Sequence, residues 1–430
     1  MNKQSSILAD KLIDFIDLSP VSYFAVKNIM RKLENQGYQH LNEGDIWNIT
    51  LGGKYYITRN ESALIAFHLG SKKPQDSGFH LAGAHTDSPH LKLKNEALQK
   101  VAGCLKVSIE TYGGAINSTW LDRDLSLAGR VSIKTAQGIE SRLIDFKRPI
   151  GIVPNLAIHL NRETNKGIEY NKQTQLAVIL FASAQDVDEK TYLKSMVANE
   201  MNLDSDAIIE MDLFFYDCQK GAFIGLDKDM IATSRLDNLA MCHAIYSSFL
   251  TATSPISTNI AVFFDSEEIG SQTMMGADSN YLDALLKRIN FSLDGTLEDD
   301  LRARHKSFFI SCDGAHALHA NFVEKHDPAY APCLNQGPVI KMSANFRYAT
   351  TASSSAKFIQ LCDKAKVPYQ KMANRSDLPS GSTIGPTVSA TLGIETIDVG
   401  NAMLAMHSIR ELQGTLDHFY MHQVLSEFYK

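Results

Sequence analysis

The stretch AVFFDSEEIGSQ, residues 261–272, joins an apolar run directly to a group of acids. The apolar residues 261–264 are typical of a buried strand. Glu267 and Glu268 follow almost at once, although adjacent glutamates repel each other and each requires solvation or a partner. The stretch therefore predicts a buried strand that carries carboxylates to a functional site at its carboxyl end.

The segments around this strand predict an α/β chain. Short apolar runs that end in turn residues, such as GFHLAGAHTDS, alternate with helical patterns such as DNLAMCHAIYSSFL. Residues 96–232 differ, because they are rich in alternating apolar residues and glycine, with a hairpin turn at Gln137-Gly138. We therefore expect an α/β domain built from residues 1–95 and 233–430, interrupted by a β-rich insertion at residues 96–232.

Composition limits the class of protein. The chain has 430 residues with 44% hydrophobic and 21% charged residues, and a net charge of -6. This mild acidity gives no support to nucleic-acid binding, and no apolar run reaches the roughly 18 residues that cross a bilayer. Asp10 and Lys11 interrupt a signal-peptide core, and the six cysteines form no Cys-x-x-Cys pair. We expect a cytoplasmic protein with reduced thiols and no membrane or nucleic-acid partner.

Polar side chains follow several predicted strands. In an open parallel sheet, groups at the carboxyl ends of the strands converge on one crevice. Residues that are far apart in the sequence therefore come together there. The candidates are His85 and Asp87 in GAHTDSPH, Asp237 in SRLDNLA, Glu267 and Glu268 in FDSEEIGS, Asp313 and His316 in SCDGAHALH, and His407 in AMHSIRE.

These residue types form a set of nitrogen and oxygen ligands without a thiolate. Such a set suits zinc, manganese or cobalt. Four carboxylates balance the charge of two divalent ions, and without metal some of them would have to protonate. On an extended segment Glu267 and Glu268 would point in opposite directions, so that one binds metal while the other contacts the water beside it. Asp87 is placed to accept the N–H of the His85 imidazole and to fix its tautomer.

Each motif alone also has a simpler interpretation. Asp237 fits a helix N-cap equally well, Glu267 and Glu268 fit a solvated loop, Asp313 fits a cap, and His407 fits a packed core histidine. The joint pattern, with candidate ligands in separate segments of one domain, favours a site for two metal ions.

The motifs together resemble the aspartyl aminopeptidase family of metallopeptidases. The matching segments are HTDSPHLKLK, NLAIHLNRE, SRLDNLA, DSEEIGS, SCDGAHALHANF, GPVIKMSANFRYAT, PSGSTIGP and AMHSIRE, in family order. The resemblance implies a catalytic α/β/α domain with a mixed, mostly parallel sheet, interrupted by a β-rich dimerisation or lid domain. It also implies assembly of the dimers into a dodecamer.

The resemblance also implies roles for individual residues. One of two zinc ions would be held by His85 and Asp313 and the other by Glu268 and His407, with Asp237 as the bridge. Glu267 would be the general base, and the Asp237-Asn238 peptide would be cis. His159 would reach into a neighbouring subunit's active site, although in NLAIHLNRE it also fits an ordinary residue of a half-exposed strand.

The resemblance further implies an enzyme that removes N-terminal residues, preferably Asp or Glu, from peptides with a free N-terminus. Lys341 is the candidate for binding the acidic side chain, assisted by His316, although Lys341 also fits a surface lysine. The loop at residues 379–383 would offer backbone N–H groups to substrate, or is a plain turn that leads into a helix. The alternatives in function are a di-metal peptidase or amidohydrolase of broader specificity, and a non-catalytic binding homologue of the same fold.

Overall fold

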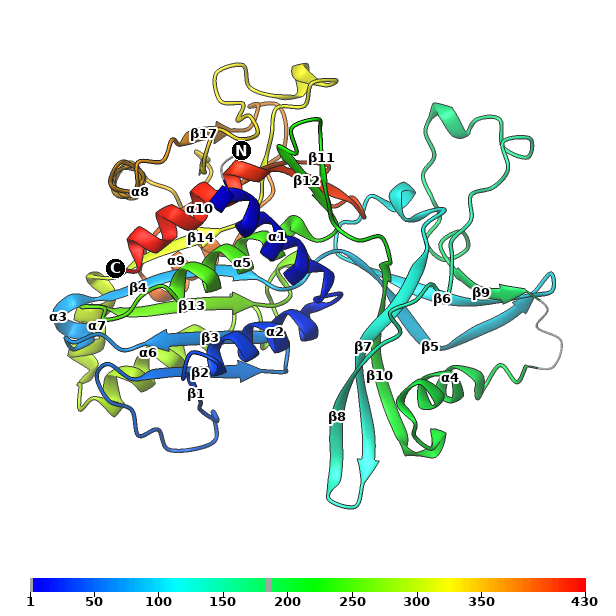
Figure 1. Cartoon of the computed structure of the whole chain (residues 1–430), viewed down its shortest axis with the longest axis horizontal. Coiled ribbons are helices and arrows are strands. Elements are labelled where there is room, and N and C mark those ends of the chain that lie inside the picture. The colour runs from blue at the N-terminus through cyan, green and yellow to red at the C-terminus, as the bar shows by residue number, and fades with distance from the viewer. Residues whose placement is uncertain (1–2, 183–186) are drawn as a thin grey trace. The chain divides into compact units, whose positions relative to one another are not determined.

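The computed structural model describes residues 3–182 and 187–430. The chain divides into two units (Figure 1). The first unit contains Met1–Asp87, Gly221–Met406 and Glu411–Lys430, and the second contains Ser88–Lys220 and His407–Arg410. The limits of the inserted domain at residues 96 and 232 stay a prediction.

A mixed, mostly parallel sheet forms the centre of the first unit. Within the described residues it has nine strands in the order β1-β2-β3-β13-β4-β14-β18-β16-β17. Strands β13, β4, β14 and β18 are mutually parallel, whereas β3 and β16 run antiparallel to their inner neighbours. The strands are β1 (Gln39–His40), β2 (Lys54–Arg59), β3 (Ala63–His68), β4 (Phe79–His85), β13 (Thr258–Phe264), β14 (Phe308–Cys312), β16 (Val339–Met342), β17 (Gln370–Ala373) and β18 (Glu395–Gly400).

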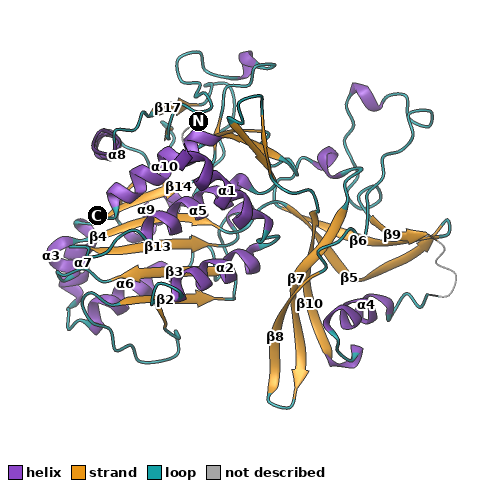
Figure 2. Cartoon of the chain, viewed as in Figure 1, coloured by secondary structure: helices purple, strands orange, loops and turns teal. Residues whose placement is uncertain are grey.

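Helices cover both faces of this sheet (Figure 2). Alternate residues of a strand point to opposite faces, so Ala261 and Phe263 of β13 pack in one core while Ile260, Val262 and Phe264 pack in the other. The first core includes α1 (Lys3–Asp17), α2 (Ser22–Glu34), α5 (Leu236–Phe249), α8 (Ala352–Ala365) and α10 (Thr415–Phe428). The second includes α6 (Tyr281–Ser292), α7 (Leu297–His305) and α9 (Ile384–Leu392), and the short α3 (Pro74–Ser77) precedes β4. The predicted α/β/α class is confirmed.

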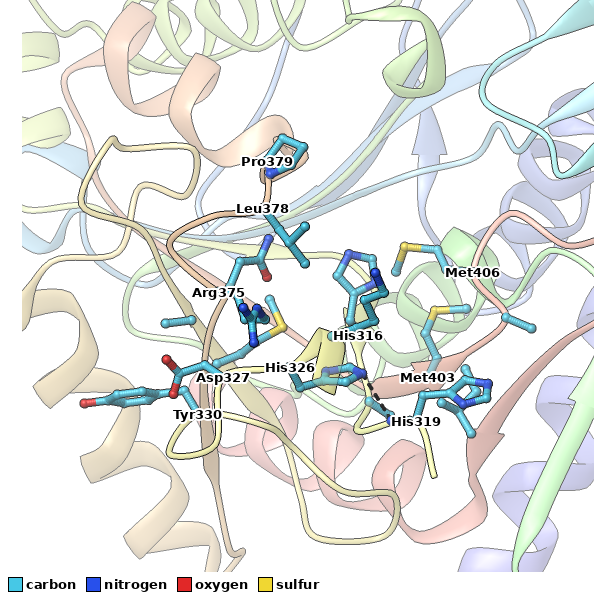
Figure 3. Close-up of a pocket in the computed structure, with 17 residues that line it drawn as sticks. His316, His319, His326, Asp327, Tyr330, Arg375, Leu378, Pro379, Met403 and Met406 are labelled. Carbon is cyan, nitrogen blue, oxygen red and sulfur yellow. Dashed lines mark hydrogen bonds between the residues drawn. The ribbon is translucent and has the colours of Figure 1, made fainter. Parts of the chain in front are cut away.

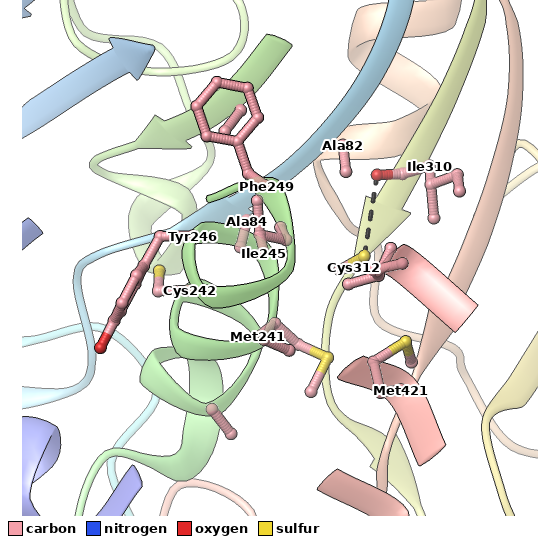
Figure 4. Close-up of a cluster of buried hydrophobic side chains, with 14 of the residues drawn as sticks. Ala82, Ala84, Met241, Cys242, Ile245, Tyr246, Phe249, Ile310, Cys312 and Met421 are labelled. Carbon is pink, nitrogen blue, oxygen red and sulfur yellow. Dashed lines mark hydrogen bonds between the residues drawn. The ribbon is translucent and has the colours of Figure 1, made fainter. Parts of the chain in front are cut away.

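Helix α5 lies deep in the first core because it is apolar on nearly all sides. Met241, Ile245 and Phe249 are buried against Ala82 and Ala84 of β4 and against Ile310 of β14 (Figure 4). A helix that is hydrophobic all round is stable only when it is enclosed. In the first turn of α5 the Asp237-Asn238 peptide is cis, as the resemblance implies.

A smaller sheet in the first unit lies beside the strands that carry the site. It has the order β11-β12-β20-β19-β15. In β15, Ala315 and His316 pair with Ala402 and Met403 of β19. The strands are β11 (Ala222–Ile224), β12 (Met230–Thr233), β15 (Ala315–His316), β19 (Ala402–Leu404) and β20 (Glu411–Gly414).

The second unit is mostly antiparallel β-structure. Its sheet has the order β8-β7-β10-β5-β6-β9, and its core includes Trp120, Phe215 and, from the helix α4 (Tyr192–Met201), Val197. The predicted hairpin is confirmed, because Thr135 pairs with Gly138 at the turn between β7 and β8. The strands are β5 (His90–Val101), β6 (Cys104–Tyr112), β7 (Leu125–Thr135), β8 (Gly138–Asp145), β9 (Val178–Ala182) and β10 (Ile208–Asp217).

Across residues 3–182 and 187–430, no helix has both the length and the apolar character needed to cross a membrane.

Candidate metal centre and active site

The carboxyl ends of three neighbouring parallel strands carry the candidate residues of the first unit. Strand β4 ends at His85, Glu267 and Glu268 follow the end of β13, and Asp313 follows the end of β14. Asp237 enters from the first turn of α5. The parallel pairing of these strands brings all three ends to one edge of the sheet.

The imidazole of His85 lies at the centre of the acidic cluster. Its Nε2 atom is 3.4 Å from Asp237 Oδ1 and 3.8 Å from both Glu267 Oε2 and Asp313 Oδ1. One ligand atom from each of His85, Asp237 and Glu268 lies within 4.8 Å of the others. The structure thus brings together five of the residues that the sequence predicts as metal ligands or general base.

Asp87 contacts both His85 and the turn that carries the two glutamates. The His85 Nδ1 atom is 3.1 Å from the carbonyl oxygen of Asp87 and 3.3 Å from its Oδ1. Both are acceptors, so Nδ1 carries a proton and Nε2 faces the carboxylates. The same carboxylate accepts the backbone N–H groups of Glu267 at 3.2 Å and Glu268 at 3.1 Å. Asp87 therefore orients the imidazole and fixes the turn that carries both glutamates.

The two glutamates lie in a turn and not on an extended segment. Glu267–Ile269 forms one turn of 3₁₀ helix, entered through Ser266 at φ 65° and left through Gly270 at φ 98°. The expectation that an extended backbone separates their side chains is therefore wrong. A non-glycine residue at positive φ is uncommon and persists where the surroundings hold it, and here the Asp87 carboxylate supplies two of the bonds that do so.

The electrostatics of the cluster fit a divalent cation. Burial, reinforced by Asp313 and Asp237, raises the pKa of Glu267 to about 8. Burial and the charge of Asp237 also raise the pKa of Glu268 well above its ordinary value. Burial lowers the pKa of His85, but hydrogen bonds to Asp237, Asp313 and Asp87 outweigh burial and raise the pKa well above its ordinary value. These raised pKa values show that the cluster has an excess of negative charge, which a bound divalent cation would neutralise. Its oxygen and nitrogen donors suit zinc.

Lys341 is buried beside the acidic cluster. It is 3% exposed, and its Nζ lies 3.7 Å from Asp313 Oδ2 and 5.3 Å from the centre of the Tyr348 ring. Burial lowers its pKa, but Asp313, Tyr348 and Asp398 outweigh this effect, and the net pKa is raised. Lys341 is therefore a charged ammonium group inside the protein, and the alternative of a surface lysine is wrong.

Two buried acids that were not predicted from the sequence accept hydrogen bonds from segments around the site. Asp398 accepts the Ala349 N–H and the Thr383 hydroxyl, both at 2.6 Å. It thereby ties the segment that carries Tyr348 to the loop at residues 379–383. Glu411 accepts the Asp237 N–H at 3.0 Å. The acid within the apolar run IDVG was the available signal for Asp398, because a buried carboxylate requires donors.

The structure does not connect the remaining candidate residues to the acidic cluster by a direct contact. Thr383 is the N-cap of α9, so the loop at 379–383 does lead into a helix, and its contact with substrate stays a prediction. His316 is exposed at the end of β15 and lines the pocket drawn in Figure 3. Partial desolvation by the surrounding protein and the charge of Lys341 lower its pKa, although Asp237 and Asp313 act in the opposite direction. His407 and His159 belong to the second unit. There His407 Nδ1 lies 3.1 Å from the Gly114 carbonyl oxygen, and His159 is exposed in a turn. The roles of these two histidines stay predictions.

Comparison with known proteins identifies related sequences. A family model described as "Aminopeptidase I zinc metalloprotease (M18)" matches residues 15–429. A "Probable M18 family aminopeptidase 2" of Clostridium novyi is 45% identical over 424 residues, which cover 98% of both chains. A protein of the same description from Pseudomonas entomophila is 45% identical over 421 residues, covering 97% of both chains.

Solved structures share the fold over nearly the whole chain. The structure described as "Cryo-EM structure of the Ape4 and Nbr1 complex" matches with a TM-score of 0.95 and 34% identity, covering 99% of this chain and 86% of that chain. The "Structure of S. cerevesiae mApe1 dodecamer" matches with a TM-score of 0.87 and 27% identity, covering 100% of this chain and 97% of that chain.

Proposed function

This chain belongs to the M18 family of zinc aminopeptidases, and on that premise we propose that it removes N-terminal Asp or Glu residues from peptides with two metal ions and a glutamate base. The family makes it a metallo-aminopeptidase, and the substrate preference and the roles of single residues are our proposal. The observation that carries it is the buried acidic cluster around His85.

The donor set divides naturally between two ions. His85 and Asp313 would hold one, Glu268 and His407 the other, and Asp237 would lie between them. When bound, such ions supply Lewis-acid chemistry, which lowers the pKa of water and polarises a carbonyl group. Zinc is the metal of the family, and the same ligands accept manganese or cobalt.

Glu267 acts as the general base in this proposal. It takes a proton from the water that attacks the carbonyl carbon of the first residue, and it later returns that proton to the leaving amine. Bound cations would keep the Glu267 carboxylate ionised at neutral pH, so that it can accept a proton from a water molecule beside it. Its Oε2 lies 3.8 Å from His85 Nε2, so the base is beside the proposed ligands.

A neighbouring subunit completes the site in this proposal. His159 is exposed on the second unit and would donate a hydrogen bond to the oxygen on which negative charge develops. This requires a homo-oligomer, and we propose a dodecamer built from dimers, as described for the mApe1 relative.

Lys341 selects acidic N-terminal residues in this proposal. Its buried ammonium group lies between Asp313 and the Tyr348 ring, so a substrate carboxylate would meet a charge that water screens poorly. His316, which lies three residues after Asp313 at the end of β15, would add a hydrogen bond.

A panel of fluorogenic aminoacyl amides tests this function. We expect kcat/KM to favour Asp and Glu over Leu, and Lys341→Met to reduce the ratio of Asp to Leu by roughly 30-fold, because a lost buried charge pair costs about 2 kcal/mol or more. An acetylated aspartyl amide should resist cleavage, because an aminopeptidase requires the free amine.

The matched control is Lys371→Met, which removes an exposed lysine on the adjacent strand β17. It should leave the ratio unchanged. Equal cleavage of Asp and Leu substrates by the wild-type protein would favour the alternative of a broader-specificity peptidase. Cleavage of the acetylated substrate would refute the aminopeptidase assignment.

A further inference from the structure

The two histidines that the proposed function makes metal ligands share one hydrogen-bond arrangement. His85 Nδ1 lies 3.1 Å from the carbonyl oxygen of Asp87, and His407 Nδ1 lies 3.1 Å from the carbonyl oxygen of Gly114. A carbonyl oxygen can only accept, so in the neutral ring that binds metal each Nδ1 carries the proton and each Nε2 has the lone pair. Metal-binding histidines usually donate their second ring N–H in this way, and the bond fixes the tautomer and the direction of the ring.

The segment that contains Gly114 also binds the backbone of His407. The Ile116 N–H donates to the His407 carbonyl oxygen at 3.0 Å, so one short stretch of chain contacts both the ring and the main chain of this residue. His407 has φ 65°, which is uncommon for a residue other than glycine and persists where the surroundings hold it. The conformation of His407 therefore depends on residues 114–116.

The residue two positions after His407 is anchored to the same segment. Ile409 donates its N–H to Thr119 Oγ1 at 3.0 Å, and the Thr119 hydroxyl donates to the Ile116 carbonyl oxygen at 2.7 Å. The Ile409 side chain is buried in the core of the second unit. These residues all belong to that unit, which contains Ser88–Lys220 and His407–Arg410. The insertion thus supplies contacts that hold the chain around His407.

Gly114 lies too close to the imidazole for a larger residue to fit without movement. A Cβ atom at Gly114 would lie 3.2 Å from His407 Nδ1 and 3.6 Å from His407 Cε1. The shorter distance is below ordinary van der Waals contact, so an alanine there would displace the ring by a few tenths of an ångström. Gly114 does not have the positive φ that would itself exclude alanine. The position therefore requires glycine for space next to the ring.

We propose that the Gly114 carbonyl group and the Thr119 hydroxyl position His407 to bind metal through Nε2, so that the insertion controls binding of the second metal ion within its own chain. The inference rests on the proposed function, in which His407 is a ligand of that ion. The first ion, whose ligand His85 is oriented by Asp87, does not depend on this segment. The insertion thereby acts on the metal centre of its own chain, besides its role toward a neighbouring subunit.

Zinc titration of the chelated Gly114→Ala variant tests the inference, with bound zinc measured by equilibrium dialysis and elemental analysis. The second ion should bind about 10- to 100-fold more weakly than in the wild-type protein, the usual effect of disturbing an outer partner of a metal-binding histidine. The first ion should keep its affinity. Thr119→Val should also weaken the second ion, whereas Thr119→Ser, which keeps the hydroxyl group, should bind it as the wild-type protein does.

The matched control is Gly44→Ala, another exposed glycine, where the nearest neighbour of a Cβ atom would be Asn42 Oδ1 at an ordinary 3.5 Å. It should bind both ions normally. Unchanged binding of the second ion by Gly114→Ala and Thr119→Val would overturn the inference, and so would equal weakening of both ions. A wild-type protein that binds a single ion, or a His407→Ala variant that binds two normally, would refute the ligand set of the proposed function itself.

Discussion

Replacing Glu267 with glutamine should lower kcat by roughly 100- to 10,000-fold, the contribution of a positioned general base. The amide has nearly the same shape but cannot accept the proton from water. Because our proposal does not make Glu267 a metal ligand, elemental analysis should find the same metal content as in the wild-type protein. Steady-state kinetics on an aspartyl amide and metal analysis of the same sample provide both measurements.

Glu268→Gln is the informative comparison, because it changes the neighbouring residue in the same 3₁₀ turn. This variant should lose metal as well as activity, since Glu268 shares the ligand cluster with His85 and Asp237. If Glu267→Gln retained near-normal turnover, Glu267 would not be the base. If it lost its metal, Glu267 would be a ligand, and the division of roles between the two glutamates would be wrong.

His159→Ala should lower kcat by roughly 100- to 1,000-fold, the cost of removing one hydrogen-bond donor to the developing oxyanion. Metal content and oligomeric state should be unchanged, because His159 is exposed in a turn of the second unit. Alanine at His305, another exposed histidine, at the end of α7, is the matched control and should leave kcat unchanged.

Mixed oligomers test whether His159 acts between subunits. Dissociating and reassembling equal amounts of the His159→Ala and Glu267→Gln proteins should restore about a quarter of wild-type activity, because random assortment pairs an intact base with an intact neighbouring histidine at that frequency. Each protein reassembled alone should stay inactive. Failure of the mixture to recover activity, with mixed oligomers present, would place His159 outside the neighbour's site.

The sequence was sufficient for the arrangement of the cluster but not for its local geometry. The buried strand before Asp265 and the polar ends of β4 and β14 were recognisable because apolar runs with polar ends have few other interpretations. The 3₁₀ turn at Glu267 could not be recognised from the sequence. It depends on a positive φ at Ser266, and a serine residue does not indicate that conformation.

Buried carboxylates outside the motifs were equally hard to predict. Asp398 and Glu411 each lie in a strand and bind backbone or hydroxyl donors from other segments. The apolar run IDVG indicates that Asp398 is buried, but the sequence does not show which donors from other segments a buried acid meets. Only the three-dimensional structure gives such partners, as it does for Lys341, whose burial against Asp313 no local pattern indicates.

Metal titration of the chelated protein tests most directly the claim that paired cations occupy the acidic cluster around His85. Activity on an aspartyl amide should disappear on chelation and return as zinc is added, reaching its plateau when elemental analysis finds two ions per chain. Full activity in protein that contains no stoichiometric transition metal would contradict the account.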